Sequence, residues 1–445
     1  MAVTTTQTTT TAPAAAAATG AGMKRVFSRS RTSSVASATP AASAKANSDF
    51  VLSEADMKNV RIVVPADIAV LAGGREKTQA PPSTLYGGLS SENKARVAVT
   101  QSFALSPYKM LVEYKVARIV GFGSNGVVLA ASCVASSTPV AIKVIYKSRA
   151  SSKYIKNPNE VDVLKFVNQQ IEQTNQNEPS NIITYIEDWQ DANHFYLVTE
   201  LFGSDWLAAS PASSDEMNPL LFKAVFENAP PVKISLPFSA GSSDLWAWSY
   251  AHRAHVWETS HQAHSMLPLR PIKQLMKQLA TALARMHTLG FYHGDIKVEN
   301  VLVQSGGGEG PEIKLADFGH AKHSSFGIKC YGTQEVSVPE FLADCPYVPE
   351  TLDGRACDIF ALGMVMFVLL NESGELPRAV KAVKSGKLGY NQLMHSNQDN
   401  GLFPFDAIAD ADVYSQNLLD GMCCIDPTLR MTIDQVLVHP WLSDV

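Results

Sequence analysis

The sequence predicts an α+β fold of two lobes, a small antiparallel β lobe with one helix and a larger, mainly α-helical lobe. Short β-branched runs bounded by Gly, Ser or Pro follow one another from about residue 114, as strands connected by hairpins do. A single amphipathic helix pattern interrupts these runs near residue 158. After residue 201 the apolar residues recur with the helical period, which indicates that helices build most of the second lobe.

Changes in composition along the chain predict its domain organisation. Residues 1–48 are dominated by Thr, Ala and Ser and contain almost no side chains that could form a core, which indicates a disordered tail. The tail lacks acidic residues, which also fits an organelle transit peptide, although we favour a solvated tail. An N-terminal extension of unknown role, residues 49–113, follows it. The remaining domain covers residues 114–442, with a small lobe over about 114–201, an insert over about 207–266 and a large lobe over about 267–442.

Overall composition narrows the functional class and the compartment. The 445-residue chain has a formal charge of -5, so it has no overall basic field that would favour a nucleic-acid partner. The longest uncharged apolar run, Ile359–Leu370, has 12 residues, whereas a membrane-spanning helix needs roughly 20. Six cysteines without a CxxC pair, and the lack of a secretory leader, favour reduced thiols. We therefore expect a cytoplasmic or nuclear protein without a membrane span.

The elements of the small lobe can be read in order. Three strands are expected in the runs KVARIV, GVVLAA and PVAIKVIY, and two more near residues 182–189 and 195–200. Between them, Asn157-Pro158 opens a helix. Its apolar face, at helical spacing, carries Glu160, Leu164, Val167 and Ile171. One carboxylate therefore shares the buried face of this helix.

The large lobe begins with a strongly amphipathic helix that Pro271 opens and Gly290 closes. Before it, no regular pattern organises the insert, where we expect a loop and a short helix. The insert contains His252, His255, His261 and His264 beside several tryptophans. This spacing allows a zinc site, but no cysteine or nearby acid completes one, so an aromatic-rich packing helix is the favoured interpretation.

A Gly-x-Gly-x-x-Gly pattern at Gly121, Gly123 and Gly126 is the first sign of a nucleotide site, although alone it also fits a dinucleotide-binding turn. Such a turn would open a helix and be followed by an acidic residue about 20 positions later. Here a β-branched run follows and leads into the strand that contains Lys143. The glycines therefore belong to a hairpin whose backbone amides can approach phosphate groups closely.

Lys143 supplies a fixed cation for the α and β phosphates of a nucleotide. Because strand side chains alternate, Ala141 shares its face and would lie against the adenine. A lysine on an inward face needs a carboxylate partner, and Glu160 is the obvious one. A surface lysine and a solvated glutamate remain the alternative.

Asp295, Asn300 and Asp317 stand at the ends of two short predicted strands, which brings groups that bind metal or accept protons together. Phosphoryl transfer needs a carboxylate that orients the hydroxyl and takes its proton, a lysine near the γ-phosphate, and oxygen ligands for Mg²⁺. Asp295, Lys297, Asn300 and Asp317 match these needs in order.

With these motifs in this order, the sequence resembles eukaryotic protein kinases of the serine/threonine, calmodulin-dependent-like type over roughly residues 114–442. The resemblance implies an ATP- and Mg²⁺-dependent kinase in which Asp295 is the catalytic base and Lys297 contacts phosphate. It makes Asn300 and Asp317 the metal ligands. The ATP-binding residues that it implies are Val120, Gly121, Gly123, Gly126, Val128, Ala141, Lys143, Glu160, Thr199 and Glu200.

Further motifs fit the same resemblance. Residues 332–340 look like a substrate-docking segment, and Asp358–Gly363 looks like the buried helix that anchors the catalytic loop. Arg430 resembles the arginine that pairs with Glu340. Lys297, together with Thr333 in the docking segment, is similar to enzymes that act on serine or threonine. Glu299 suggests protein substrates with an arginine upstream of the target residue.

One departure from the family pattern has a regulatory consequence. Gly294 stands where an arginine usually precedes the catalytic aspartate and pairs with a phosphate on the activation segment. We therefore predict that activity does not depend on phosphorylation of Ser324 or Ser325. A second departure places Asn125 at the tip of the glycine loop, where an aromatic residue is common.

Two other classes of function stay open at this point. A pseudokinase or scaffold would keep the fold for binding nucleotide and partners, but the intact Lys143, Asp295, Asn300 and Asp317 argue against it. A small-molecule or lipid kinase would be expected to lack the docking segment and the Asp358 helix. The sequence does not indicate the oligomeric state.

Overall fold

The computed structural model describes part of the 445-residue chain. The described residues are 57, 59–66, 68, 86–147, 158–174, 179–206, 217–239, 242–260, 267–306, 310–328, 338–342, 344–348, 351–396, 401–408 and 411–445. The chain divides into two units, 1–49 and 50–445, and all described residues belong to the second. The disordered tail predicted for residues 1–48 therefore lies outside the described residues.

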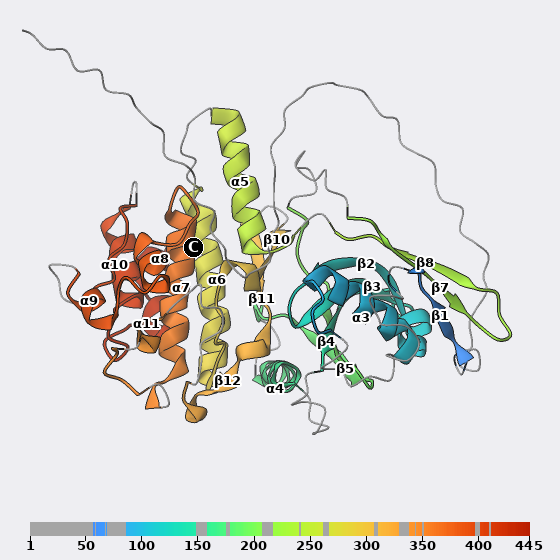
Figure 1. Ribbon diagram of the computed structural model, residues 1–445. Helices are drawn as coiled ribbons and strands as arrows, with labels where there is room; N and C mark the ends of the chain where they lie inside the picture. Colours follow the sequence, from blue (N-terminus) through green and yellow to red (C-terminus); the bar gives the residue numbers. More distant parts are fainter. Residues whose placement is uncertain are drawn as a thin grey trace, which may run out of the picture. The chain divides into compact units, whose positions relative to one another are not determined.

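The small lobe contains a five-stranded antiparallel sheet with the strand order β2-β3-β4-β6-β5 (Figure 1). Its strands are β2 (Tyr114–Phe122), β3 (Gly126–Cys133), β4 (Pro139–Tyr146), β5 (Tyr185–Gln190) and β6 (His194–Glu200). Side chains alternate along β4, where Val140, Ile142 and Val144 are fully buried. The predicted antiparallel β lobe is confirmed.

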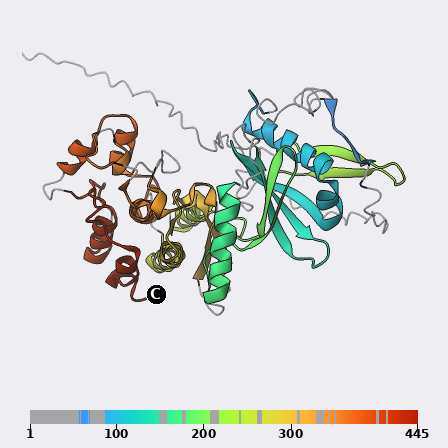
Figure 2. The same cartoon turned by 90° about the horizontal axis from the view of Figure 1, so that it is seen from below.

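The one helix predicted within this sheet is α4 (Asn159–Thr174). Its first turn follows Pro158, whose carbonyl accepts bonds from the amides of Val161 and Asp162. The helix contacts both β5 and the 3₁₀ turn η6 (Phe318–His320) of the large lobe, and Figure 2 shows it beside the sheet. It therefore links the sheet to the segment that carries Asp317.

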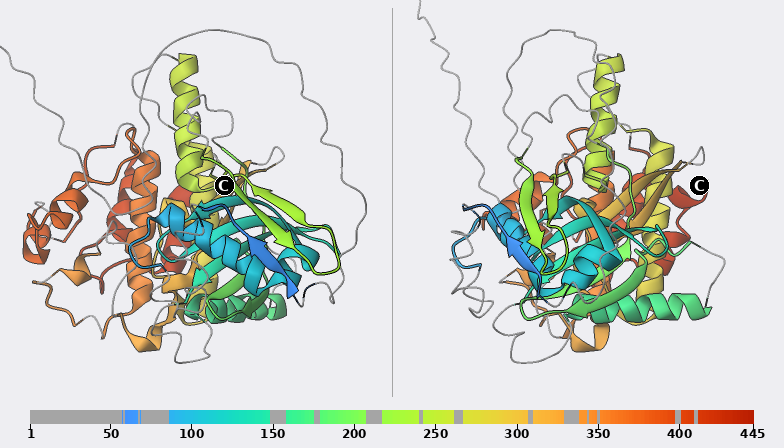
Figure 3. Two further views of the ribbon diagram at one scale, coloured as in Figure 1. Left: turned by 45° about the vertical axis from the view of Figure 1, so that its right-hand side comes forward. Right: turned by 90° about the vertical axis from the view of Figure 1, so that its right-hand side faces the viewer.

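The N-terminal extension also contains regular structure. Its helix α3 (Ser91–Leu105) begins at Ser90, whose Oγ accepts a bond from the amide of Asn93. A π-helical turn, η3 (Lys109–Glu113), then leads into β2. Helix α3 contacts strands β2, β3 and β4 (Figure 3). Its fully or nearly fully buried apolar residues, which share one core with the sheet, are Ala95, Val97, Ala98, Val99 and Phe103.

The structure differs from the sequence prediction in the insert. A hairpin of β7 (Leu220–Val225) and β8 (Val232–Leu236) pairs with β1 (Arg61–Val63) of the N-terminal extension in a second antiparallel sheet, with the order β1-β7-β8. The sequence of the insert predicted only a loop and a short helix here. Buried and exposed residues alternate along β7, so the strand signal was present but too short to be decisive.

The large lobe is mainly helical, as predicted. Helix α6 (Leu269–Thr288) is the amphipathic helix expected from Pro271, and Gly290 follows it with a φ of +79°. Helix α7 (Gly354–Leu370) is buried over almost its whole length. The other helices are α5 (Leu245–Ser260), α8 (Arg378–Lys384), α9 (Tyr390–Met394), α10 (Val413–Met422) and α11 (Ile433–Leu437). None of the helices in the described ranges is both long and apolar enough to cross a membrane.

Among the described residues of the large lobe, four short strands and several 3₁₀ turns carry part of the candidate site. The strands are β9 (Phe291–Tyr292), β10 (Val301–Gly306), β11 (Gly310–Leu315) and β12 (Lys322–His323). Strands β10 and β11 form one antiparallel pair, and β9 and β12 form another. The 3₁₀ turns are η5 (Val298–Asn300), η6, η7 (Ser324–Phe326), η8 (Pro339–Phe341) and η10 (Pro440–Leu442).

Candidate active site

Three charged side chains from separate parts of the chain meet at one point. Lys143 lies on β4, Glu160 in the first turn of α4, and Asp317 two residues after β11. The Nζ atom of Lys143 is 2.5 Å from Glu160 Oε1 and 3.0 Å from Asp317 Oδ1. The side chains of Lys143 and Glu160 are mostly buried, with 24% and 9% of their surfaces exposed. The ion pair predicted between Lys143 and Glu160 is thus present, and the alternative of a solvated pair does not hold.

Charge interactions among Lys143, Glu160 and Asp317 shift the pKa values of these three side chains. Burial lowers the pKa of Lys143, but the carboxylates of Asp317 and Glu160 outweigh it and hold that pKa well above its ordinary value. The Lys143 ammonium is the main reason that the pKa of Asp317 lies well below its usual range. Burial raises the pKa of Glu160, and Lys143 offsets that effect only in part. Lys143 and Asp317 therefore carry charge at neutral pH.

The backbone at Asp317 is held in a sparsely populated conformation. Its φ and ψ angles are 63° and 76°, in the left-handed region that a residue with a side chain seldom adopts. The Asp317 Oδ1 atom also accepts a bond from the amide of Gly319. Residues in such strained conformations cluster at functional sites, where the surrounding structure holds them in place.

The glycine-rich loop, residues 121–126, is a hairpin turn between β2 and β3, as the sequence predicted. The amide of Gly123 donates to the carbonyl of Gly126 at 2.9 Å and closes the turn. A Cβ atom at Gly126 would lie only 2.6 Å from the backbone oxygen of Val144, so this position requires glycine. In the sheet register, Gly121 faces Val128, and Val128 faces Lys143. The register thus brings the loop and the lysine together.

The remaining predicted nucleotide residues lie on the same sheet. Val120 is on β2 beside Gly121, and Ala141 pairs with Thr199 of β6. Glu200 ends β6, and its carboxylate accepts bonds from the amide of Thr184 at 2.7 Å and from the ammonium of Lys314. Lys314 was not among the residues predicted for the site. The Glu200 backbone is bonded as well, because its amide donates to the Thr184 oxygen at 3.1 Å and its oxygen accepts a bond from Thr199 Oγ1 at 3.2 Å.

Asp295, Lys297 and Asn300 form the centre of the predicted catalytic loop, which runs from β9 to β10. The Nδ2 of Asn300 donates to the backbone oxygen of Asp295 at 2.7 Å and to its Oδ2 atom at 2.9 Å. The Lys297 Nζ lies 2.9 Å from the same carboxylate oxygen. Asp295 is 6% exposed, so these donors fix the orientation of a buried carboxylate.

Asn300 and Asp317 have the chemistry of a site for a hard cation. Because the Asn300 nitrogen already donates two bonds, the amide oxygen is the atom that can bind a metal. Magnesium is usually held by one or two carboxylates together with substrate phosphates and water. Within the described ranges, no group of three or more His, Cys, Asp or Glu residues could hold a metal. The Asp317 carboxylate and the Asn300 amide oxygen fit such a metal, which takes its other ligands from phosphates and water.

Asp358 of α7 anchors the catalytic loop. Its Oδ2 and Oδ1 atoms accept bonds from the amides of His293 at 2.7 Å and Gly294 at 2.9 Å. The His287 Nε2 lies 3.0 Å from the same carboxylate, which is fully buried. Helix α7 is therefore the anchoring helix that the resemblance to protein kinases predicted at Asp358–Gly363. Without these donors the buried carboxylate would be strongly destabilised.

The His293 ring connects the catalytic loop to the segment of Asp317. It lies edge-to-face against Phe318, with 5.1 Å between ring centroids. Its Nε2–H donates to the carbonyl of Ala316 at 3.1 Å, and its Nδ1 accepts a bond from the amide of Asp295. Burial lowers the pKa of His293. A neutral ring with one donor and one acceptor satisfies both bonds.

The substrate-docking segment is described only at its end. There, Arg430 Nη1 lies 2.6 Å from Glu340 Oε1, and both side chains are completely buried. The pairing of these two residues is thus confirmed. Burial lowers the pKa of Arg430, but the Glu340 carboxylate outweighs it and raises that pKa above its ordinary value. Residues 332–337, with Thr333, lie outside the described residues.

The histidines of the insert are described in part. His252 Nδ1–H donates to the carbonyl of Trp248 at 2.8 Å, and the ring packs near Trp206 and Trp248, with centroid distances of 5.5 and 4.4 Å. These contacts are those of a packing helix. His261 and His264 lie outside the described residues.

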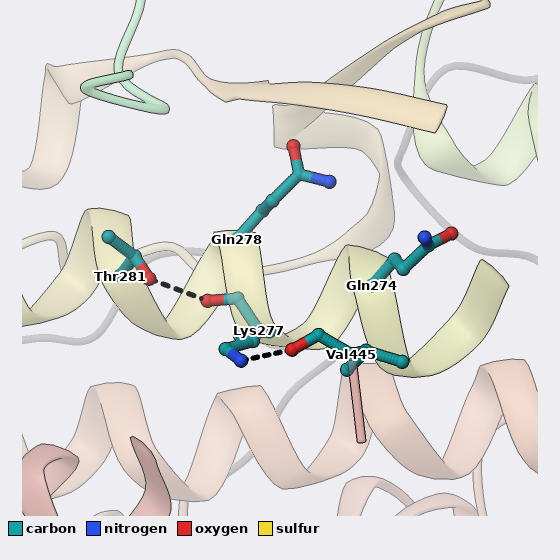
Figure 4. A pocket seen from close by; sticks show the side chains of 5 residues that line it. All are labelled: Gln274, Lys277, Gln278, Thr281 and Val445. Atoms are coloured by element: carbon teal, nitrogen blue, oxygen red, sulfur yellow. Dashed lines mark hydrogen bonds between the residues drawn. The ribbon is translucent and has the colours of Figure 1, made fainter. Parts of the chain in front are cut away.

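A separate hollow lies on the surface of α6 (Figure 4). Gln274, Lys277, Gln278, Thr281 and Val445 line it. Lys277 Nζ donates to the backbone oxygen of Val445, and Thr281 Oγ1 donates to that of Lys277 at 2.8 Å. None of the predicted site residues lines this hollow, so it is distinct from the candidate active site.

Comparison with known proteins agrees with the geometry. Residues 244–442 match the family described as "Protein kinase domain". Over 197 residues the chain is 29% identical to the serine/threonine-protein kinase PKZ1 of Phytophthora infestans, covering 41% of this chain and 47% of that protein. It is 34% identical over 172 residues to the human serine/threonine-protein kinase DCLK3, covering 38% of this chain and 24% of that protein. It is 25% identical over 318 residues to calcium/calmodulin-dependent protein kinase type 1 of Macrobrachium nipponense, covering 69% and 68%.

The fold and the site agree with this family match, and protein kinase domains in general use ATP and a divalent metal ion. The chain resembles serine/threonine-protein kinases and a calcium-dependent protein kinase over part of its length, and the family match places the protein kinase likeness in residues 244–442. It spans about half or less of the length of PKZ1 and DCLK3. The family match covers the catalytic loop but not the glycine-rich loop or Lys143. The evidence for the small-lobe half of the site is therefore the geometry of these residues in the structure.

Proposed function

We propose that this chain is a catalytically competent serine/threonine protein kinase that transfers the γ-phosphate of Mg·ATP to protein hydroxyl groups. One observation carries the proposal: Lys143 Nζ contacts Glu160 at 2.5 Å and Asp317 at 3.0 Å. The cation for the nucleotide phosphates and the carboxylate for the metal are therefore held together before any ligand binds. A scaffold without turnover would not need this arrangement.

The catalytic loop supplies the groups that the transfer requires. The substrate oxygen attacks the γ-phosphorus, the bond to ADP breaks, and the buried carboxylate of Asp295 accepts the hydroxyl proton. Lys297, held at that carboxylate, would stabilise charge on the transferred phosphoryl group. Asn300 and Asp317 would hold Mg²⁺, which when bound neutralises charge that develops on the phosphate oxygens.

The charge of the catalytic loop supports a substrate preference. Glu299 is exposed in the turn between Lys297 and Asn300. A carboxylate next to the catalytic groups favours a substrate guanidinium, which pairs with carboxylates in a two-pronged geometry. We therefore expect protein substrates with an arginine upstream of the target serine or threonine.

The activation segment supports activity without a phosphate on Ser324 or Ser325. Gly294 offers no cation for a phosphate. The amide of Ser324 donates to the carbonyl of Gly290 at 2.7 Å, and Ser325 Oγ lies 2.8 Å from His323 Nδ1. The turn that carries both serines is therefore already held by neutral bonds.

The direct test is ATP-dependent phosphorylation of a peptide library by the wild-type protein and by Asp295→Asn. We expect wild-type activity on serine and threonine peptides, enriched for upstream arginine, and none with the variant. A Ser324→Ala/Ser325→Ala double variant should keep wild-type activity. Wild-type protein that binds Mg·ATP but phosphorylates no peptide would disprove the proposed turnover.

A further inference from the structure

A short segment of the insert covers the outer edge of the strand that leads into the glycine-rich loop. Strand β2 is the terminal strand of the five-stranded sheet, so its outer backbone groups would otherwise lack a strand partner. Pro237–Ser239 runs parallel to it. The amide of Ile119 donates to the Pro237 oxygen at 2.9 Å, and the amide of Ser239 donates to the Ile119 oxygen at 2.7 Å. These three residues therefore act as an added strand.

The side chain of Phe238 extends this contact into the glycine-rich loop. Its ring lies edge-to-face against the ring of Phe122, with 5.7 Å between centroids and an interplanar angle of 84°. Phe122 stands between Gly121 and Gly123 of the loop. The contact is therefore made to the part of the chain that would cover the nucleotide phosphates.

Helix α3 holds Phe238 from the other side. The Arg96 guanidinium lies over the Phe238 ring, 4.7 Å from its centroid, and its Nη2 donates to the backbone oxygen of Asn218 at 2.7 Å. Glu92 pairs with the same guanidinium at 2.9 Å. Arg96 thus ties both ends of the β7–β8 hairpin to the N-terminal extension, and its side chain is only 13% exposed.

Just beyond Ser239 the chain is fixed to the other half of the site. The oxygen of Ser243 accepts a bond from the amide of Val303 at 2.7 Å, and Asp244 pairs with Leu302 of β10. Strand β10 begins directly after Asn300. Only three residue steps separate Ser239 from Ser242, which limits their separation to about 11 Å. Residues 239–243 of the insert are therefore a short stretch of chain whose ends are hydrogen-bonded to β2, which leads into the glycine-rich loop, and to β10, which follows the catalytic loop.

We propose that Pro237–Ser239, with Phe238 at its centre, positions the glycine-rich loop for ATP, an inference that rests on the proposed kinase function. A loop that is already ordered in the free protein loses less conformational freedom when the nucleotide binds. By linkage, nucleotide binding must stabilise the segment in return. Phe238 is a positioning residue that acts on ATP through Phe122.

Phe238→Ala tests the side-chain contact, and Ser239→Pro removes the amide that donates to Ile119. Losing an edge-to-face pair should raise the KM for ATP and the Kd for the magnesium complex of adenylyl imidodiphosphate about three- to tenfold. We expect kcat to change by less than about twofold, because the catalytic loop is untouched. Leu221→Ala is the matched control, since Leu221 is a half-exposed apolar residue on β7 of the same hairpin. It should leave both constants unchanged. Wild-type nucleotide affinity in a folded Phe238→Ala variant would overturn the proposal.

Hydrogen exchange on the wild-type protein gives a test that needs no variant. Saturation with the magnesium complex of adenylyl imidodiphosphate should slow exchange at the Ser239 and Ile119 amides at least about threefold. Unchanged exchange at Ser239 in the saturated protein would also overturn the proposal. Both readouts follow binding rather than turnover. A protein that binds nucleotide but transfers no phosphate would thus refute the proposed function and still test the role of Phe238.

Discussion

Lys143 Nζ and Asp317 Oδ1 are 3.0 Å apart although 174 positions separate the two residues in the sequence. The contact joins β4, the second strand after the glycine-rich loop, to the segment that follows β11. Phosphoryl transfer relies on positioning and electrostatic stabilisation more than on covalent chemistry. This one contact therefore brings together the two halves of the candidate site.

Replacing Lys143 should abolish most of the activity and leave the protein folded. Lys143→Met removes the only cation between Glu160 and Asp317 in the described part of the site, and losing one electrostatic group of this kind lowers kcat about 10²- to 10³-fold. Lys115→Met is the control, because Lys115 is an exposed lysine on β2 of the same sheet. Steady-state kinetics on a peptide substrate would check this, and near-wild-type kcat in Lys143→Met would contradict it.

The stability lost in Lys143→Met should depend on pH. The pKa of Asp317 is depressed in the folded protein, so its contribution is present above its unfolded pKa of about 4 and is lost as the pH falls towards the folded pKa. The pKa of Lys143 is raised, so its contribution is present below about pH 10 and is lost as the pH rises through the folded pKa. The difference in unfolding free energy between wild type and Lys143→Met should therefore be largest between about pH 5 and 9. Urea unfolding across this range would measure it, and a pH-independent difference would refute the ion-pair explanation.

Breaking the buried pair of Arg430 and Glu340 should destabilise the protein, and the losses from its two members should not add. Glu340→Gln leaves the Arg430 cation buried without its carboxylate, which destabilises proteins by about 3–5 kcal/mol. Arg430 also donates to the carbonyls of Ala356 and Cys424, so it cannot easily leave the core. The double variant Glu340→Gln/Arg430→Met should lose less than the sum of the two single variants. Chemical denaturation of all four proteins would show this, and strict additivity would contradict it.

Gly294 should tolerate no side chain. Besides the missing arginine discussed above, the backbone itself therefore requires glycine at this position. Its φ is +77°, and a Cβ atom would lie 2.7 Å from the backbone oxygen of His320. Gly88 is a matched control, since its φ is +76° but a Cβ atom there would meet nothing within 4 Å. Gly88→Ala should cost about 1–2 kcal/mol for the left-handed backbone alone. Gly294→Ala should cost more and also reduce activity. Equal losses of unfolding free energy in the two variants would refute the argument from His320.

The sequence predicted that the candidate site residues come together, because each of them lies in a short local motif. Lys143 lies in a β-branched strand, and Asp317 follows another strand. The residue type and the position at or after a strand could therefore both be recognised from the sequence. The second sheet was missed because β1 and β7 are short and pair residues as distant as Arg61 and Val225. Nothing local to either strand indicates that pairing.

The packing of α3 on the sheet escaped prediction for a different reason. Thr100, Gln101 and Ser102 are buried in this helix, which obscures its apolar face. The hydroxyls of Thr100 and Ser102 donate back to carbonyls of their own helix, at 2.8 Å to Val97 and 2.8 Å to Ala98. Hydroxyl groups that donate to carbonyls of their own helix can be buried without a distant partner, and the sequence therefore does not indicate their burial.

The N-terminal extension should therefore be required for the stability of the small lobe. Phe103 of α3 is 2% exposed and lies edge-to-face against Phe222 of the hairpin, with 5.0 Å between ring centroids. Phe103→Ala should destabilise the protein by about 3–5 kcal/mol, because a buried aromatic side chain is lost and a cavity remains. Leu105→Ala, at a 41% exposed position in the same helix, should change stability by less than about 0.5 kcal/mol. Thermal and urea unfolding would compare them. A Phe103→Ala protein as stable as Leu105→Ala would mean that α3 does not belong to the core of the small lobe.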